Sequence, residues 1–155
     1  MAKNNFIDPG MKKTKKSAAK AEHSKKKSIQ QAKLAVKNQF YLEASWLISS
    51  LLESRLKNLL RKADHQQPLT GFTLEQSIKR VKFLLLTSEN ATLTGAFDVA
   101  LIDEIRNWKN QRNTILNDMI DVHVSQSRLE RLSMDGMRLY RDWKKAAKQF
   151  KSDHT

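Results

Sequence analysis

Two arginines lie within apolar helical stripes, where a charged side chain needs a partner. Arg112 follows Trp108 by four residues and precedes Ile115 by three, and Arg55 follows Leu51 by four. At about 100° per residue, each arginine falls on the same helix face as its apolar neighbours. A guanidinium is costly to bury unpaired, and its planar set of donors suits a phosphate. Two alternatives stay open: each arginine snorkels or pairs with a carboxylate, or both line one cleft that receives an anion.

Polar side chains recur every four residues beside Arg112. They are Lys109, Asn113, Asn117 and Asp121. Residues four apart are neighbours on a helix surface, so these four form one polar strip next to the apolar stripe. The strip is either an ordinary solvated face or part of the lining of an anion-binding cleft.

Helices must position these side chains, because no stretch of the chain alternates between apolar and polar residues with period two. Helical spacing of apolar residues covers 28–62, 73–86, 96–118 and a last segment from 127 to near the C-terminus. The apolar faces include Phe40 in the first segment and Met119 at the end of the third. The expected fold is all-α: an antiparallel helical bundle of four main helices joined by short loops.

Three Ser or Thr residues are followed three positions later by Gln or Glu, a spacing typical of the capping box at a helix start. The pairs are Ser28 with Gln31, Thr73 with Gln76, and Ser127 with Glu130. Gly136 lies inside the apolar stripe of the last helix. It either lets a neighbouring helix approach closely or costs some stability.

The N-terminal segment carries most of the net charge of +13. Residues 1–37 contain 11 lysines against Asp8 and Glu22, whereas residues 38–155 contain 18 basic and 14 acidic side chains. High charge, few apolar residues and the Pro9-Gly10 pair predict a disordered basic arm over residues 1–27, with the folded domain over 28–155. Lysine is a point charge, so the arm would contact phosphates without reading sequence, bind an acidic protein, or serve as a solubilising tail. The lysines expected to contact RNA are Lys12, Lys13, Lys15, Lys16, Lys25, Lys26 and Lys27.

Other classes of chemistry have little support. The chain has no cysteine, which excludes disulfides and thiolate metal sites. It contains no HExxH, Walker, GxGxxG or GxSxG motif, so we expect no metal and no cofactor. No apolar run approaches the length of a membrane span, and the N-terminus lacks the apolar stretch of a signal peptide. We therefore expect a cytoplasmic protein of one domain that does not enter a membrane.

The segment RNTILN, from Arg112 to Asn117, resembles the Arg-Asn-x-x-x-His signature of the HEPN superfamily. The first predicted helix, with Glu53 and Arg55, is also similar to the opening helix of such proteins. HEPN proteins are small helical bundles, often dimers, and many are metal-independent ribonucleases of toxin–antitoxin and phage-defence systems. The resemblance covers about residues 40–150 in outline, and only the six-residue motif is specific. The motif departs from the family at its last position, which is Asn117 rather than His.

The resemblance implies a role for each motif residue. Arg112 and Asn113 would grip and position a phosphate, with Lys109 and Arg55 adding to the RNA-binding surface. In the family, the Arg and His act on the ribose 2′-hydroxyl and the scissile phosphate. An amide such as Asn117 can donate a hydrogen bond but cannot exchange a proton near neutral pH. The nearest histidine, His123, lies six residues further on, past the expected end of the helix.

The leading hypothesis is therefore a HEPN-like RNA-binding domain, dimeric, whose ribonuclease activity is weak or lost. Two alternatives stay open. The chain is an active metal-independent endoribonuclease toxin, partnered by an antitoxin, in which Asn117 and Arg112 orient the RNA. Or it is a non-enzymatic helical protein that binds an acidic protein partner through the basic arm.

Overall fold

The computed structural model describes the backbone of residues 9–63, 71–87 and 90–153, without the side chains of 9–18, 21, 22 and 25. Within these ranges the secondary structure is helical and contains no strand, so the all-α class is confirmed. The helices are α1 (Pro9–Lys37), α2 (Tyr41–Ala63), α3 (Leu74–Thr87), α4 (Ala91–Ala96), α5 (Val99–Asp121) and α6 (Gln126–Asp153).

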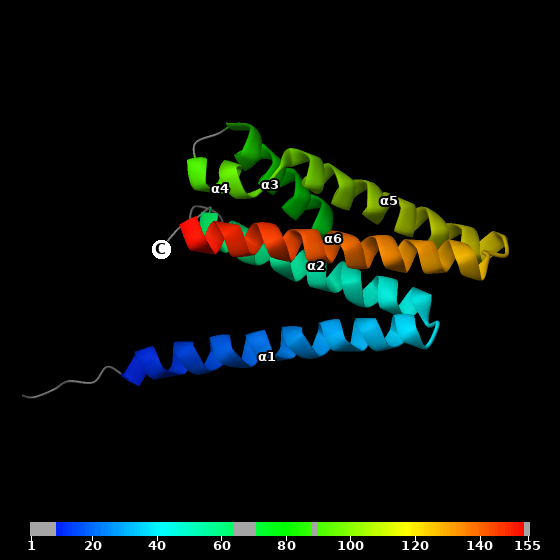
Figure 1. Ribbon diagram of the computed structural model, residues 1–155, viewed down its shortest axis with the longest axis horizontal. Coiled ribbons are helices and arrows are strands. Elements are labelled where there is room, and N and C mark those ends of the chain that lie inside the picture. Colours follow the sequence, from blue (N-terminus) through cyan, green and yellow to red (C-terminus); the bar gives the residue numbers. More distant parts are fainter. Residues whose placement is uncertain (1–8, 64–70, 88–89, 154–155) are drawn as a thin grey trace, which may run out of the picture.

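The long helices lie side by side, but they do not simply alternate in direction. Helix α2 packs against α1, α3 and α6, while α5 packs against α3 and α6. The colours of Figure 1 show α1 and α5 running one way and α2 and α6 the other. The neighbours α2 and α6 are therefore parallel, and the predicted antiparallel bundle of four helices is not confirmed.

The chain breaks between α1 and α2, within the single helix that the sequence predicts over residues 28–62. Gln39 adopts a left-handed conformation with φ of 63°. The Phe40 N–H donates to the Ala35 carbonyl at 2.8 Å, as in a helix end that closes with a left-handed residue. The chain then folds back, so α1 and α2 form a helical hairpin. Phe40 lies at this corner and is exposed rather than part of the core.

Helix α1 begins much earlier than the predicted start at Ser28. Ser28 does not cap a helix; its hydroxyl donates to the Ser24 carbonyl at 3.0 Å, inside α1. The structure describes residues 9–27 as the N-terminal part of α1, where the sequence predicts a disordered arm. Lysine and alanine favour helix strongly, and proline is tolerated in a first turn, so local propensity outweighs the repulsion between charges.

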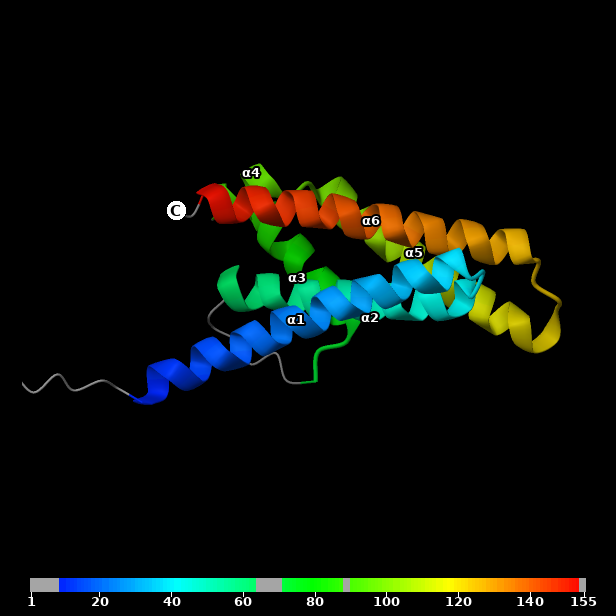
Figure 2. The ribbon, with the colours of Figure 1, turned by 60° about the horizontal axis from the view of Figure 1, so that its bottom comes forward.

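The N-terminal part of α1 extends away from the other helices (Figure 2). Packing begins at Ile29, which contacts the core, and continues with the buried Ala32 and Ala35. The side chains described between residues 19 and 27 are exposed. The basic segment is thus a helical extension of the hairpin rather than a detached coil.

Side chains cap the starts of α3 and α6, but the cap of α6 is not the residue that the sequence predicts. The capping box at Thr73 is confirmed, because the Gln76 N–H donates to Thr73 Oγ1 at 3.2 Å and Thr73 N–H to Gln76 Oε1 at 2.8 Å. The box predicted at Ser127 is wrong. Ser125 lies before α6 instead, and its Oγ accepts from the Arg128 N–H at 3.3 Å.

A short helix, α4, occupies part of the loop predicted between the second and third helices. Asn90 caps it by accepting from the Leu93 N–H at 3.0 Å. Asp98 caps α5 in the same way, accepting from the Ala100 N–H at 3.0 Å. Helix α4 packs on α6 and buries Leu93 and Phe97 against the C-terminal part of the bundle.

The centre of the core is a contact between three helices at Gly136 of α6. A Cβ atom built there would lie 2.7 Å from Trp108 Cζ2 and 3.1 Å from Ile48 Cγ2. The Trp108 ring is fixed, because its Nε1–H donates to the Leu132 carbonyl at 2.8 Å. Gly136 therefore permits the close approach of α5 to α6, the first of the two alternatives from sequence. Met119, by contrast, is exposed rather than part of this core.

Candidate functional site

Arg112 is partly buried on the core-facing side of α5, as its spacing predicts. Its Nε is fully buried and has no hydrogen-bond partner among the residues that the structure describes. Burial lowers the pKa of the guanidinium from its ordinary value. An arginine stays protonated even so, because its pKa lies far above neutrality. Within the described part of the chain Arg112 forms no ion pair, so the alternative in which it pairs with a carboxylate gains no support.

Helix α3 begins beside Lys109. The two helices run in opposite directions, since Lys82 of α3 pairs with Asp103 at 2.7 Å while Glu75 pairs with Lys109. Glu75 lies in the first turn of α3, so the N-terminal end of that helix contacts Lys109. Arg112 lies nearly one turn further along α5.

Lys109, the first residue of the polar strip, is engaged by Glu75 together with two other cations. Arg106 Nη2 lies 3.0 Å and Lys79 Nζ 3.8 Å from Glu75 Oε1. The hydrogen bond from Lys109, followed by the charges of Lys109, Arg106 and Lys79, holds the pKa of Glu75 below its usual range. The charge of Lys109 thus joins α5 to α3, and it is less available to an RNA phosphate than the sequence predicts.

The two asparagines of the motif lie on the surface of α5. Both Asn113 and Asn117 are exposed. On a regular helix, side chains five residues apart leave the axis about 140° apart, so Asn117 and Arg112 diverge. A single chain therefore does not bring the amide of Asn117 onto the guanidinium of Arg112.

Arg55 and Arg112 do not line one cleft. The alternative in which both arginines receive the same anion is therefore not supported. Ile48 and Trp108 meet at Gly136. Arg55 lies seven residues after Ile48 along α2, and Arg112 lies four residues after Trp108 along α5. Because α2 and α5 run in opposite directions (Figure 1), the two arginines lie on opposite sides of this contact. At about 1.5 Å per residue, this places them ~16 Å apart along the bundle. Arg55 instead donates from Nη2 to the Tyr140 hydroxyl at 3.3 Å.

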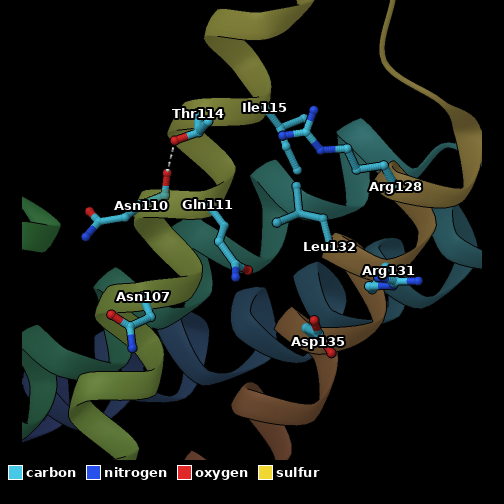
Figure 3. A pocket seen from close by; sticks show the side chains of 9 residues that line it. All are labelled: Asn107, Asn110, Gln111, Thr114, Ile115, Arg128, Arg131, Leu132 and Asp135. Carbon is cyan, nitrogen blue, oxygen red and sulfur yellow. Dashed lines mark hydrogen bonds between the residues drawn. The ribbon is translucent and has the colours of Figure 1, made fainter.

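A groove between α5 and α6 is the largest cavity described, at about 600 Å³. Its polar lining comprises Asn107, Asn110, Gln111 and Thr114 of α5 with Arg128, Arg131 and Asp135 of α6. Figure 3 shows Gln111 pointing into the space between the two helices. Arg128 is fixed by Asp118, Nη1 to Oδ2, at 2.9 Å.

Sequence reasoning missed this groove, although the signal is present. Asn107, Asn110, Gln111 and Thr114 follow the spacing of one helix face. The sequence-based prediction covers only the strip through Asn113 and Asn117. Amides can donate and accept at once, so this second face can bind the edges of nucleic-acid bases.

The remaining predicted site residues lie apart from the motif. Lys26 and Lys27 are exposed on α1. The side chains of Lys12, Lys13, Lys15, Lys16 and Lys25 lie outside those described. His123 is exposed just after α5. Among the described residues no three His, Cys, Asp or Glu gather to hold a metal ion, and no helix is long and apolar enough to cross a membrane.

Comparison with known proteins adds no relative to this picture. No protein-family model, curated protein or solved structure matches the chain.

Proposed function

We propose that the chain is a HEPN-like RNA-binding protein whose ribonuclease activity is weak or lost, and that α5 carries its RNA-binding site. The observation that carries this proposal is Arg112. It is a partly buried cation with an unsatisfied Nε and no ion pair in the described part of the chain. A guanidinium that pairs with no carboxylate keeps donors for a phosphate, which it binds through the N–H groups other than the buried Nε.

The neighbourhood of Arg112 suits a polyanion. The first turn of α3 contacts Lys109, nearly one turn before Arg112 along α5. The exposed amides of Asn113 and Asn117 lie on the neighbouring surface of α5. On the other side of α5, the groove shown in Figure 3 offers Gln111 and the exposed Arg131 for further hydrogen bonds. These groups are suited to binding RNA, not to proton transfer.

Helix α5 itself contains no histidine, and this favours binding over efficient cleavage. Asn117 occupies the position at which the HEPN motif has histidine, and an amide does not titrate near neutral pH. His123 is exposed and lies beyond the end of α5. General acid–base catalysis contributes about 10²–10⁴-fold to such reactions, so its loss leaves at most slow cleavage.

A second copy of the chain would complete the site. Arg112 and Asn117 diverge on one helix, so two antiparallel copies of α5 could place Asn117 of each near Arg112 of the other. Apolar side chains for such a contact are exposed at the end of α5: Met119, Ile120 and Val122. Ile120 is 80% exposed, which is unusual for a large apolar residue that covers nothing.

The basic part of α1 would add affinity without specificity. RNA binding through lysines releases counterions, so each phosphate contact adds roughly 0.7–0.9 to the slope of log affinity against log salt. A helical α1 holds its lysines along a rigid extension. The same feature would serve binding to an acidic protein, which remains the alternative if RNA does not bind.

The test is RNA affinity measured by fluorescence anisotropy for the Arg112→Gln variant, with Arg141→Gln as the matched control. Arg141 is an exposed arginine of α6 whose loss removes the same charge. We expect Arg112→Gln to weaken binding by about tenfold or more, since hydrogen bonds to charged groups contribute ~1.5–3 kcal/mol. Its melting temperature should stay near that of the unmodified chain. Unchanged affinity together with a large drop in melting temperature would make Arg112 a structural residue and remove the basis of the proposal.

A further inference from the structure

A groove between α1 and α6 belongs to none of the sites above. Its volume is about 350 Å³. Near one end, the start of α6 is joined to the turn between α1 and α2, because Gln126 Nε2 donates to the Gln39 carbonyl at 3.1 Å. From this turn α1 and α6 diverge, as Figure 2 shows. The groove therefore opens towards the N-terminal part of α1.

The floor of the groove is apolar and only partly covered. It consists of Ile29 and Val36 of α1 with Met134 and Met137 of α6. Met134 is 52% exposed and the other three are partly exposed, so all four offer apolar surface to a ligand. Methionine is flexible and polarizable, and it adapts to the shape of an apolar partner.

The rim of the groove is basic. Lys33 of α1 lies on one side, with Arg141 and Lys144 of α6 on the other. All three are exposed, and none forms an ion pair within the described part of the chain. None of the described residues that line the groove is acidic. The rim is thus available to carboxylates that the described part of the chain does not itself supply.

Helix α1 carries this positive charge beyond the groove. It has 29 residues, but its packing on the core begins only at Ile29. Its sequence contains ten lysines against one acid, Glu22. Lys26 lies seven residues before Lys33, so it continues the same edge of the helix, and it is exposed. Helices without tertiary packing are marginally stable in water, and a negatively charged partner would reduce the repulsion between these lysines.

We propose that the groove binds an amphipathic acidic helix of a partner protein. An apolar floor between two helices suits side chains spaced at i, i+3, i+4 and i+7 on the partner. The rim favours carboxylates over cations by charge complementarity. Because the groove opens towards the basic part of α1, the partner helix is apolar where it meets Val36 and Met134. It is acidic where it lies beside the lysines of α1.

The test is the fluorescence anisotropy of a labelled synthetic peptide added to the full chain. Met134 to Lys144 span about 15 Å of α6, or about three helical turns. The first three turns of the peptide therefore carry leucine at positions i, i+3, i+4 and i+7, and the rest is mostly glutamate and alanine. One control peptide has its leucines spread around the helix, and another has lysine in place of glutamate. We expect the acidic amphipathic peptide to bind about tenfold more tightly than either control, because only this peptide matches both floor and rim.

Two variants of the chain test the floor and the rim separately. Met134→Gln should weaken binding of the acidic peptide by about tenfold, because apolar contact is lost. Lys144→Glu should weaken it by about fivefold, because an ion pair is lost and repulsion is added. Met119→Gln and Lys145→Glu are the matched controls, since both residues are exposed and neither lines the groove. Circular dichroism checks the fold of each variant, and Lys33→Glu replaces Lys144→Glu if the latter does not fold.

Three results would overturn the proposal. They are no binding of the acidic peptide at millimolar concentration, equal binding of the peptide whose leucines are spread around the helix, or equal losses in each variant and its control. A fourth result would assign the groove to RNA instead: Met134→Gln and Lys144→Glu weaken binding of single-stranded RNA and leave peptide binding unchanged. The groove does not include α5, so Arg112→Gln should leave peptide binding unchanged, and the RNA proposal stands or fails separately.

Discussion

Replacing Gly136 by alanine should destabilise the fold, although the same change normally stabilises a helix. In a helix interior, alanine is more favourable than glycine by about 1 kcal/mol. At this position the new methyl would lie 2.7 Å and 2.9 Å from two atoms of the Trp108 ring. Real Cβ atoms do not approach this closely, so the ring or the helix has to move.

The surroundings of Gly136 make that movement expensive. The Trp108 ring is held by its hydrogen bond to the Leu132 carbonyl at 2.8 Å, and Ile48 closes the other side at 3.1 Å. Overpacking of a core costs roughly 1–3 kcal/mol, and here a buried hydrogen bond is strained as well. After subtracting the helix gain, we expect a net loss of about 1–2 kcal/mol, which lowers Tm by roughly 3–6 °C in a chain of this length.

Urea unfolding followed by circular dichroism measures this loss. Gly95→Ala is the control, because nothing lies within 4 Å of the Cβ that it adds. We expect the control to be neutral or slightly stabilising. If Gly136→Ala were as stable as the control, the close contact of α5, α6 and α2 would be wrong, and with it the position assigned to Arg112.

Four further outcomes follow from particular residues. Gln39→Gly should stabilise the chain to urea by about 1 kcal/mol, because the left-handed φ of 63° is strained for glutamine, and a loss would contradict the turn between α1 and α2. Folding lowers the pKa of Glu75, so its ion pairs stabilise the protein at neutral pH, and this stabilisation is lost as the pH falls through the lowered pKa. Glu75→Gln should therefore lower Tm at pH 7, and the Tm values of the variant and the parent should become equal in acid. Ile120→Glu should shift any dimer towards monomer in sedimentation equilibrium, whereas the same change at the exposed Leu34 of α1 should not. Deleting residues 1–27 should leave cooperative melting intact and flatten the salt dependence of RNA binding; a loss of cooperative melting would show that the basic part of α1 belongs to the folded unit.

Local signals predicted one of the three expected helix starts. The box at Thr73 and Gln76 depends on two side chains and two backbone groups within one turn, and it forms as predicted. The break at Gln39 was not predictable in this way, because it takes no glycine or proline. The packing of α1 on α2 holds Gln39 in a conformation that its own propensity disfavours.

Helix faces were predictable, but positions along the bundle were not. Periodicity placed Arg112 on the buried face of α5, and its Nε is buried there. The same periodicity does not indicate how far one helix is shifted along another. It could not show that Arg55 and Arg112 lie on opposite sides of the contact at Gly136. The spacing of Asn107, Asn110, Gln111 and Thr114 indicates one polar face of α5, but it does not indicate that α6 lies opposite this face.

We propose that α5 carries an RNA site of HEPN type in which one residue, Asn117, prevents efficient cleavage. The most direct measurement is cleavage of single-stranded RNA without metal by the parent chain, by Asn117→His, and by Asn117→His combined with Arg112→Gln. We expect only Asn117→His to cut efficiently and to leave 2′,3′-cyclic phosphate ends. If none of the three cuts, or if cleavage is indifferent to Arg112→Gln, α5 does not carry such a site.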